Sequence, residues 1–330
     1  MVGMFYPFCA AFFIVTCGLS FLETSANPYI LSMGDESTAT QRLNLAQSFN
    51  PMGSIIGILV AKDFILAKLN KLSTDERAAL AASEFEKVKM EDLAIVRGPY
   101  VAIGLVLLVM FILIFITKMP KSKDAGESLD IAGTFKRLMA NLRYREGVIA
   151  QAFYVGAQIT VWTYTIHYGT QVLMSEGMIE ADASAQAVNF NFYAMILFGV
   201  SRFVCTFLLK YISPGRLLMI LSLGAIVLLM PVIFAGGRPG LYALIGISGC
   251  MSLMFPTIYG IALKGIGDDA KLGAAGLVMA IAGGSLMPPL QGLMLDKYGV
   301  QISYLMPIIC FVVIAYYGYR VINKHTLRPI

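Results

Sequence analysis

Charge is scarce in this sequence. Charged residues make up 14% of the 330 residues, against roughly 25% in a soluble domain, while hydrophobic residues make up 58% and the mean hydropathy is +0.73. Histidine occurs twice, tryptophan once, and the five cysteines are scattered through apolar runs without CxxC spacing. No nucleotide-binding loop, nucleophile elbow or pair of catalytic carboxylates is present. We therefore expect neither an enzyme nor a protein that holds a metal or a cofactor.

The sequence contains long runs without any charged residue. A membrane-spanning helix needs about 20 predominantly apolar residues, and the segment around Glu23 together with eight uncharged runs predicts nine spans. The eight runs are Leu43–Ala61, Gly98–Thr117, Gly147–Ser175, Ala183–Ser201, Leu217–Gly237, Pro239–Leu263, Leu272–Leu295 and Gln301–Tyr319. The chain is predicted to be an all-helical, multi-pass protein of the lipid bilayer.

Lysine and arginine predict the orientation, because loops on the cytoplasmic side are enriched in them. Basic residues outside the segment 62–97 favour a cytoplasmic C-terminus and a cytoplasmic loop at 118–146. The segment 62–97, with equal numbers of basic and acidic residues, is predicted to be an external and partly helical loop. Residues 134–145 are predicted to form a short surface helix. The net charge of +5 is an orientation signal and does not indicate nucleic acid.

Glu23 is the one carboxylate within the first apolar segment, since no charge precedes it and none follows before Asp35. A charge near the bilayer centre costs about 2.5–3.5 kcal/mol on insertion scales, so acids of this kind mark ion or substrate paths. Asn27 lies one helical turn further on the same face, and Pro28 follows it. The alternative is an acid at a helix end that reaches the headgroups. We interpret Glu23 as a proton-coupling residue.

Three amides recur every third residue at Asn44, Gln47 and Asn50, along one side of a predicted helix. Amides donate and accept hydrogen bonds, as sugar hydroxyls require, but they also hold membrane helices together. We favour helix packing for Asn44, near the membrane edge. For Gln47 and Asn50, deeper in the span, we favour a cavity.

A second polar stripe runs along the predicted span 147–175 and consists of Gln151, Gln158, Trp162 and Thr165. Trp162 is the only tryptophan, and it lies in mid-span rather than at an interface. Its ring beside the Gln158 amide suits a carbohydrate, although plain helix packing explains the pattern equally well. His167 is interpreted as structural, and Arg202 as a cytoplasmic loop anchor rather than a substrate ligand.

The sequence resembles the fucose:proton symporter family of the major facilitator superfamily. The resemblance covers essentially the whole chain and is most specific at 21–29 (FLETSANPY) and 42–50 (RLNLAQSFN), with weaker matches at 154–158, Trp162 and 255–258. It implies two helical bundles, of which the chain would hold the last three helices of the first, at 1–117, and all six of the second, at 147–330. An absent first-helix aspartate would be the partner acid of Glu23.

The resemblance also implies site residues. Glu23 would serve proton coupling and sugar binding, Gln47 and Asn50 would line the sugar cavity, and Phe198 and Phe255 would approach it from the second bundle. Phe255 stands where fucose permeases can carry a tyrosine, so one hydrogen bond to the sugar is expected to be missing. The substrate-binding candidates are Gln47, Asn50, Asn27, Gln158, Trp162, Phe198 and Phe255.

The expected activity is proton-driven uptake of a monosaccharide, with L-fucose as the expected sugar, by a monomer in the bacterial inner membrane. The open alternatives are a glucose/galactose symporter of the same family and a non-transporting fragment or sugar sensor. Because three helices of the first bundle would be missing, we expect that this chain does not transport by itself. Robust uptake by the purified, reconstituted chain would show this expectation wrong. The DNA upstream of Met1 is the most useful single observation, since an in-frame extension with three spans and an early intramembrane aspartate would restore the complete symporter.

Overall fold

The structure is a computed structural model that describes residues 5–60, 64–65, 68–70, 72, 76–77, 79–118 and 130–324. These residues fold into helices joined by short turns. They form two compact units, the first made of residues 1–19 and 53–125 and the second of residues 20–52 and 126–330. We call them unit 1 and unit 2.

Unit 1 holds the first part of α1 (Phe5–Ser32), most of α3 (Asn50–Val60) and α5 (Ala82–Ile116). None of the described side chains of α5 is buried, and nearly all its large apolar side chains between Tyr100 and Ile116 are exposed. Such a surface is far larger than a soluble protein tolerates. It is the surface expected of a helix that faces lipid.

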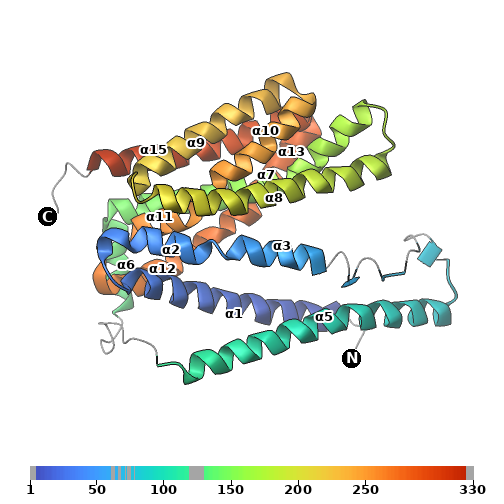
Figure 1. Cartoon of the computed structure of the whole chain (residues 1–330), viewed down its shortest axis with the longest axis horizontal. Coiled ribbons are helices and arrows are strands. Elements are labelled where there is room, and N and C mark those ends of the chain that lie inside the picture. The colour runs from blue at the N-terminus through green and yellow to red at the C-terminus, as the bar shows by residue number, and fades with distance from the viewer. Residues whose placement is uncertain are drawn as a thin grey trace. The chain divides into compact units, whose positions relative to one another are not determined.

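Unit 2 contains the end of α1, α2 (Ala39–Gln47), α6 (Ile131–Ala140) and α7 (Leu142–Ser175), followed by the helices up to the C-terminus (Figure 1). These are α8 (Glu180–Leu208), α9 (Pro214–Met230), α10 (Gly237–Met251), α11 (Met254–Leu263), α12 (Ala270–Met279), α13 (Gly283–Tyr298), α14 (Val300–Ser303) and α15 (Leu305–Lys324). A π-helical turn, Pro231–Ala235, links α9 to α10.

The core of unit 2 lies among α7, α10, α11 and α15, where tyrosines such as Tyr154, Tyr168 and Tyr304 are almost completely buried. Figure 1 shows α9 beside α15 on one side of this core and α8 beside α7 on another. Small residues let the helices approach closely. A Cβ at Gly283 would lie only 2.0 Å from the backbone oxygen of Ala152, so only glycine fits where α13 crosses α7.

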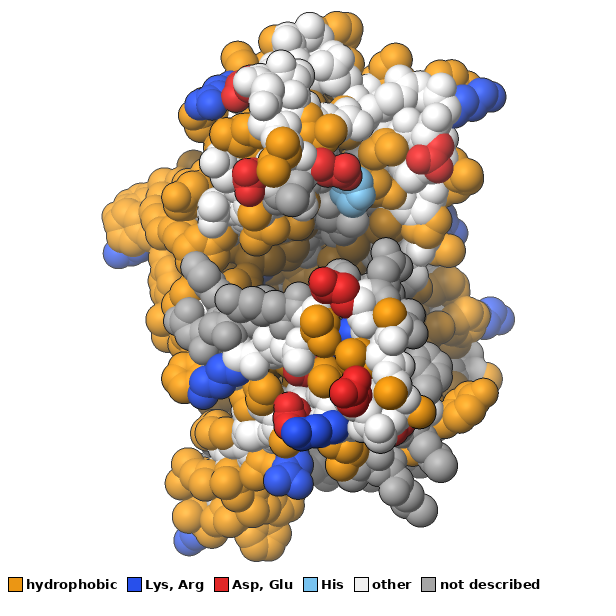
Figure 2. Space-filling view, turned by 90° about the vertical axis from the view of Figure 1, so that its right-hand side faces the viewer, with side chains coloured by type: hydrophobic (Ala, Val, Ile, Leu, Met, Phe, Trp, Pro, Cys, Tyr) orange, Lys and Arg blue, Asp and Glu red, His pale blue; other side chains and the backbone are white. Residues whose placement is uncertain are grey.

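Seven helical stretches within the described residues are long and apolar enough to cross a membrane. They are Tyr6–Ser32, Ala82–Ile116, Asp182–Leu208, Pro214–Ala235, Gly237–Leu263, Gly267–Tyr298 and Val300–Asn323. Hydrophobic side chains accordingly predominate on the outer flanks in the space-filling view (Figure 2). The predicted count of nine is not confirmed by this criterion. The α7 helix is 34 residues long but rich in polar and tyrosine side chains, and the run Leu43–Ala61 is divided between α2 and α3.

That division corrects one prediction from the sequence. Gln47 ends α2, a turn at Ser48 and Phe49 follows, and Asn50 begins α3, so the three amides do not lie along one unbroken helix. Pro51 explains the break, because proline has no N–H to donate and disfavours helical geometry in the residue before it.

Two predicted loops also contain more helix than expected. The segment 62–97 ends in helix, because α5 begins at Ala82. The predicted surface helix at 134–145 is two elements, α6 and the start of α7, with Asn141 capping α7 by accepting a hydrogen bond from the N–H of Tyr144. Residues 119–129 of the predicted cytoplasmic loop lie outside the described residues.

Candidate functional site

Glu23 belongs to a chain of hydrogen-bonded side chains that crosses from α1 to α2. The Asn27 amide Nδ2 donates to Glu23 Oε2 at 2.6 Å, and Gln47 Nε2 donates to Asn27 Oδ1 at 2.9 Å. Glu23 is half-buried, Asn27 is 3% exposed, and Glu23 lies about 14 Å along the helix from Ser32, at ~1.5 Å per residue. The Glu23 carboxylate therefore lies well inside the span, and hydrogen bonds connect it to Asn27 and, through Asn27, to Gln47. Both amides are predicted sugar-binding residues.

Arg202 connects α8 to this group of hydrogen-bonded side chains. Its Nη1 donates to the backbone carbonyl of Gln47 at 2.8 Å, and its Nε donates to the carbonyl of Ser252 at 2.6 Å. The guanidinium lies 4.8 Å from the ring centre of Phe198, and the residue is 4% exposed and interacts electrostatically with Glu23. The interpretation of Arg202 as a loop anchor is wrong, because α8 continues to Leu208 and leaves Arg202 inside the bundle.

The aromatic part of the site begins at Phe198, which is 4% exposed. Its ring meets that of Trp162 edge-on, with centroids 5.1 Å apart and an interplanar angle of 76°. Trp162 Nε1 donates to Ser248 Oγ at 3.2 Å, which fixes the indole between α7, α8 and α10. A cavity of about 430 Å³ opens beside it.

The remaining predicted residues are placed less centrally. Phe255 lies between Tyr154 and Tyr259, with ring centroids 6.3 Å from each. Gln158 is half-buried one turn before Trp162, whereas Asn50 is exposed at the start of α3. The stripe along α7 divides, because Gln151 and Thr165 are buried in the bundle.

Two functional candidates besides Arg202 were missed by reasoning from the sequence. The Tyr259 hydroxyl lies near Asn27 and Glu23, is buried, and makes no well-formed hydrogen bond with the described residues. Asn191 on α8 lines the cavity beside Trp162. Tyr259 lies four residues after Phe255, so the helical repeat alone could have pointed to it.

Charged contacts hold together the end of unit 2 where α1 and α8 finish and α2, α7 and α9 begin. Arg137 on α6 donates to both carboxylate oxygens of Asp269, at 2.9 and 2.7 Å, and this pairing raises the pKa of Arg137. Arg320 pairs with Glu146 at 2.9 Å. The N–H of Ser37 donates to Asp35 and holds the pKa of that carboxyl below its usual value.

Comparisons with known proteins identify the family of the chain, although no family model matches it. The sequence is 48% identical over 330 residues to the L-fucose-proton symporter of Haemophilus influenzae, a match that covers 96% of this chain and 75% of that protein. It is 34% identical to the L-fucose-proton symporter of Escherichia coli, covering 93% and 70%. The chain belongs to the fucose-proton symporter family of the major facilitator superfamily.

Structural similarity extends to most of the chain. The crystal structure of the major facilitator superfamily transporter FucP in the outward conformation matches with a TM-score of 0.86 at 33% identity, over 94% of this chain and 74% of that one. The family also has glucose/galactose relatives, since the Brucella abortus glucose/galactose transporter is 30% identical over 314 residues. The chain is thus a multi-pass bacterial membrane transporter with the major facilitator fold, and not an enzyme.

Proposed function

We propose that the chain performs L-fucose:proton symport by alternating access, with Glu23 as the proton-binding residue. The observation that carries the proposal is the hydrogen-bonded chain from Glu23 through Asn27 to Gln47, together with the buried Arg202 beside it. A carboxylate inside a span is costly unless it has a function, and here it is joined to amides of the kind that bind sugar hydroxyls.

Proton binding changes what this chain can do. An ionised carboxylate only accepts hydrogen bonds, as Glu23 does from Asn27. A protonated Glu23 gains a donor, accepts the hydrogen bond from Asn27 more weakly, and carries no charge through the membrane. Asn27 and Gln47 can then turn their amides to a sugar. The loaded, protonated carrier and the empty, deprotonated carrier are the two forms that reorient, which couples the two substrates.

The remaining candidates take defined roles in the same proposal. Gln47 and Asn50 bind sugar hydroxyls from α2 and α3. Trp162 and Phe198 supply the aromatic surface that packs on the C–H face of a pyranose, with Gln158 beside them. Phe255 forms an apolar wall of the site and makes no hydrogen bond to the sugar.

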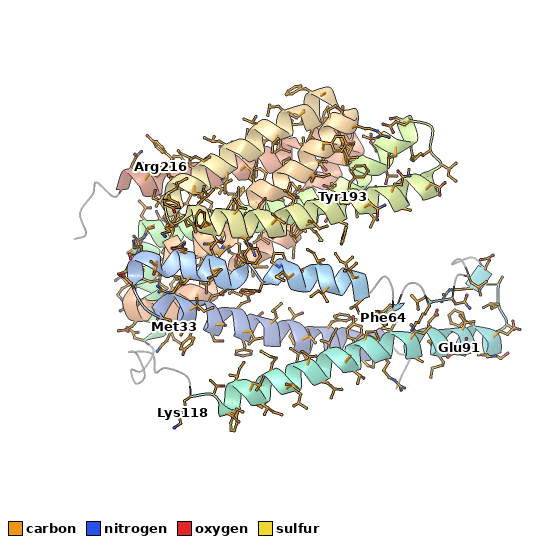
Figure 3. The ribbon with its side chains drawn as sticks, in the orientation of Figure 1. Met33, Phe64, Glu91, Lys118, Tyr193 and Arg216 are labelled. Atoms are coloured by element: carbon orange, nitrogen blue, oxygen red, sulfur yellow. The ribbon has the colours of Figure 1, made fainter. Side chains whose placement is uncertain are left out.

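For the topology, we propose nine crossings, in which α7 and the α2–α3 pair join the seven apolar stretches. The two bundles are 1–117 and 147–330, and a cytoplasmic segment at 118–146 joins them. The protein is a monomer, and its C-terminus is cytoplasmic. Met33 and Arg216 lie at one end of unit 2, and Tyr193 lies near the middle of α8 (Figure 3). The end with Arg216 is also the basic end, as the positive-inside rule requires of a cytoplasmic face.

A glucose/galactose symporter is the first rival, and the Brucella relative at 30% identity is the observation that keeps it in view. A non-transporting fragment or sugar sensor is the second. Counterflow in proteoliposomes separates all three. L-fucose should exchange with labelled L-fucose, and an excess of D-galactose or D-glucose should leave that exchange unchanged.

The same experiment can refute the proposal. Counterflow of labelled D-galactose that L-fucose does not inhibit would assign the chain to the glucose/galactose branch. Saturable binding of L-fucose without counterflow would support the second rival, a non-transporting fragment or sugar sensor. No binding of any monosaccharide would contradict sugar recognition altogether.

A further inference from the structure

The cavity beside Trp162 has two kinds of wall. It is a largely open hollow of about 430 Å³, lined by Ile159, Trp162, Thr163, Ile166 and His167 of α7 and by Asn191 of α8, all within unit 2. Three of these side chains are aliphatic or aromatic and three are polar. This size and this mixture are typical of a site for a small amphipathic ligand such as a monosaccharide.

Trp162 can offer such a ligand only its ring. The single N–H donor of the indole is already used by Ser248 Oγ at 3.2 Å, and Phe198 packs edge-on against it. An aromatic face packs well on the C–H surface of a pyranose but does not satisfy its hydroxyls. Any hydrogen bond between this cavity and a sugar must therefore come from the polar wall.

Asn191 is the member of that wall whose hydrogen bonding is incomplete. Its Nδ2 donates to the backbone carbonyl of Trp162 at the long distance of 3.3 Å. Its Oδ1 is buried and has no partner among the described residues. An unpaired buried acceptor costs free energy in the empty protein, and a ligand that supplies a donor removes the cost. The residue as a whole is half-buried and lines the cavity, so a rotation of the carboxamide would bring Oδ1 to a ligand there.

We propose that Asn191 is a sugar-binding residue whose Oδ1 accepts a hydrogen bond from a hydroxyl of the pyranose that lies on the face of Trp162. The inference rests on the proposed sugar transport and adds a specific ligand in α8 to it. Turning the carboxamide gives up only the 3.3 Å contact with a carbonyl of the α7 helix. Thr163 and His167, one turn apart on α7, lie in the same wall and can contact neighbouring hydroxyls.

The chain carries its own probe for this site, because Trp162 is the only tryptophan. Tryptophan fluorescence, excited where tyrosine does not absorb, therefore reports on the cavity wall alone. We would titrate the purified chain with L-fucose and compare it with Asn191→Ala and with Asn189→Ala. Asn189 lies on the same helix, two residues earlier, and is exposed. Asn191→Ala should weaken L-fucose binding at least about tenfold, and Asn189→Ala should leave it unchanged.

A further variant separates sugar binding from support of the tryptophan. Asn191→Asp keeps an acceptor oxygen but cannot donate to the Trp162 carbonyl, so it should bind L-fucose within about threefold of the wild type. An equal loss in Asn191→Ala and Asn191→Asp would mean that Asn191 only positions Trp162, which overturns the proposal. If Asn191→Ala does not fold, Asn191→Leu, which fills the volume without an acceptor, replaces it with the same expected loss.

The remaining outcomes distinguish this inference from the proposed function. Unchanged affinity in a folded Asn191→Ala, while the wild type binds L-fucose, overturns the role of Asn191 and leaves the symporter proposal standing. Absence of a fluorescence response and of binding of labelled L-fucose by equilibrium dialysis in the wild type overturns both.

Discussion

The guanidinium of Arg202 on α8 donates a 2.8 Å hydrogen bond to the backbone carbonyl of Gln47 at the end of α2. That carbonyl lies at a break between two helices, where backbone oxygens lack their helical partners. Arg202 supplies the missing hydrogen bond to this carbonyl, and its Nε donates to the carbonyl of Ser252. One buried cation thus fixes Gln47, whose side chain is hydrogen-bonded to Asn27 and, through Asn27, to Glu23. The polar part of the site thus depends on a residue that does not itself belong to the amide chain.

Replacing Arg202 by lysine should expose this dependence. The guanidinium makes two charge-assisted hydrogen bonds in divergent directions, and a lysine ammonium on a flexible stem cannot reproduce both. We expect Arg202→Lys to lower the free energy of unfolding by about 1.5–3 kcal/mol, the range for a hydrogen bond to a charged group. Thermal unfolding in detergent measures it, with the exposed Arg216→Lys as the control. Equal stability in the two variants would contradict the role of Arg202.

Glu23→Gln tests the proton-binding role directly. Glutamine keeps the volume and the hydrogen-bonding capacity but cannot exchange a proton. If Glu23 carries the proton, the variant should lose the pH dependence of uptake while keeping exchange of L-fucose for L-fucose. The measurement is uptake and counterflow in proteoliposomes at several pH values. Proton coupling that persists unchanged in the variant would rule out the role.

Gln47 and Asn44 should separate ligand binding from helix packing. Asn44 is completely buried, and its Nδ2 donates to the Thr40 carbonyl at 2.8 Å and to Thr257 Oγ1 at 3.2 Å, joining α2 to α11. Asn44→Ala should lower stability by about 1–3 kcal/mol and keep the affinity for L-fucose, whereas Gln47→Ala should weaken affinity about tenfold with a smaller loss of stability. Sugar titrations and thermal unfolding of both variants give the result. Unchanged affinity in Gln47→Ala would return Gln47 to a packing role.

A pH-dependent contact lies at the opposite end of α7. Arg238 donates to both carboxylate oxygens of Glu176 at 2.8 Å, and these hydrogen bonds lower the pKa of Glu176. A carboxyl whose pKa falls on folding contributes stability above its unfolded pKa and loses it as the pH falls through the lower, folded value. Arg238→Gln should therefore lower the melting temperature slightly at neutral pH, and the difference should disappear in acid. A difference that is constant with pH would contradict the ion pair.

Much of the fold was predictable, because length and hydropathy alone determine whether a helix can cross a membrane. The predicted helix bounds were less accurate where an apolar run contains a residue, such as proline, that interrupts the helical backbone. The run Leu43–Ala61 is uncharged throughout, yet Pro51 breaks it into α2 and α3. Conversely, the helix α7 is longer than any predicted span, although its tyrosines and amides lower its hydropathy.

Local spacing predicted part of the site. The i, i+4 relation of Glu23 and Asn27 is a property of one helix, and the structure has the corresponding hydrogen bond. Arg202 was misread because the uncharged run ends at Ser201, which makes the next residue look like a membrane boundary. The carbonyls that satisfy Arg202 belong to Gln47 and Ser252, far away in sequence, and no pattern within α8 reveals them.

The central claim is that sugar binding and protonation of Glu23 are linked, and proton uptake on ligand binding measures that link most directly. L-fucose added to the purified protein in weakly buffered detergent should raise the pH of the medium, saturating near about one proton per bound sugar. Glu36→Gln, which changes an exposed carboxylate, should behave like the wild type, and Glu23→Gln should bind the sugar without proton uptake. Proton uptake of equal size in Glu23→Gln, or L-fucose binding by the wild type with no proton uptake at any starting pH, would contradict the account.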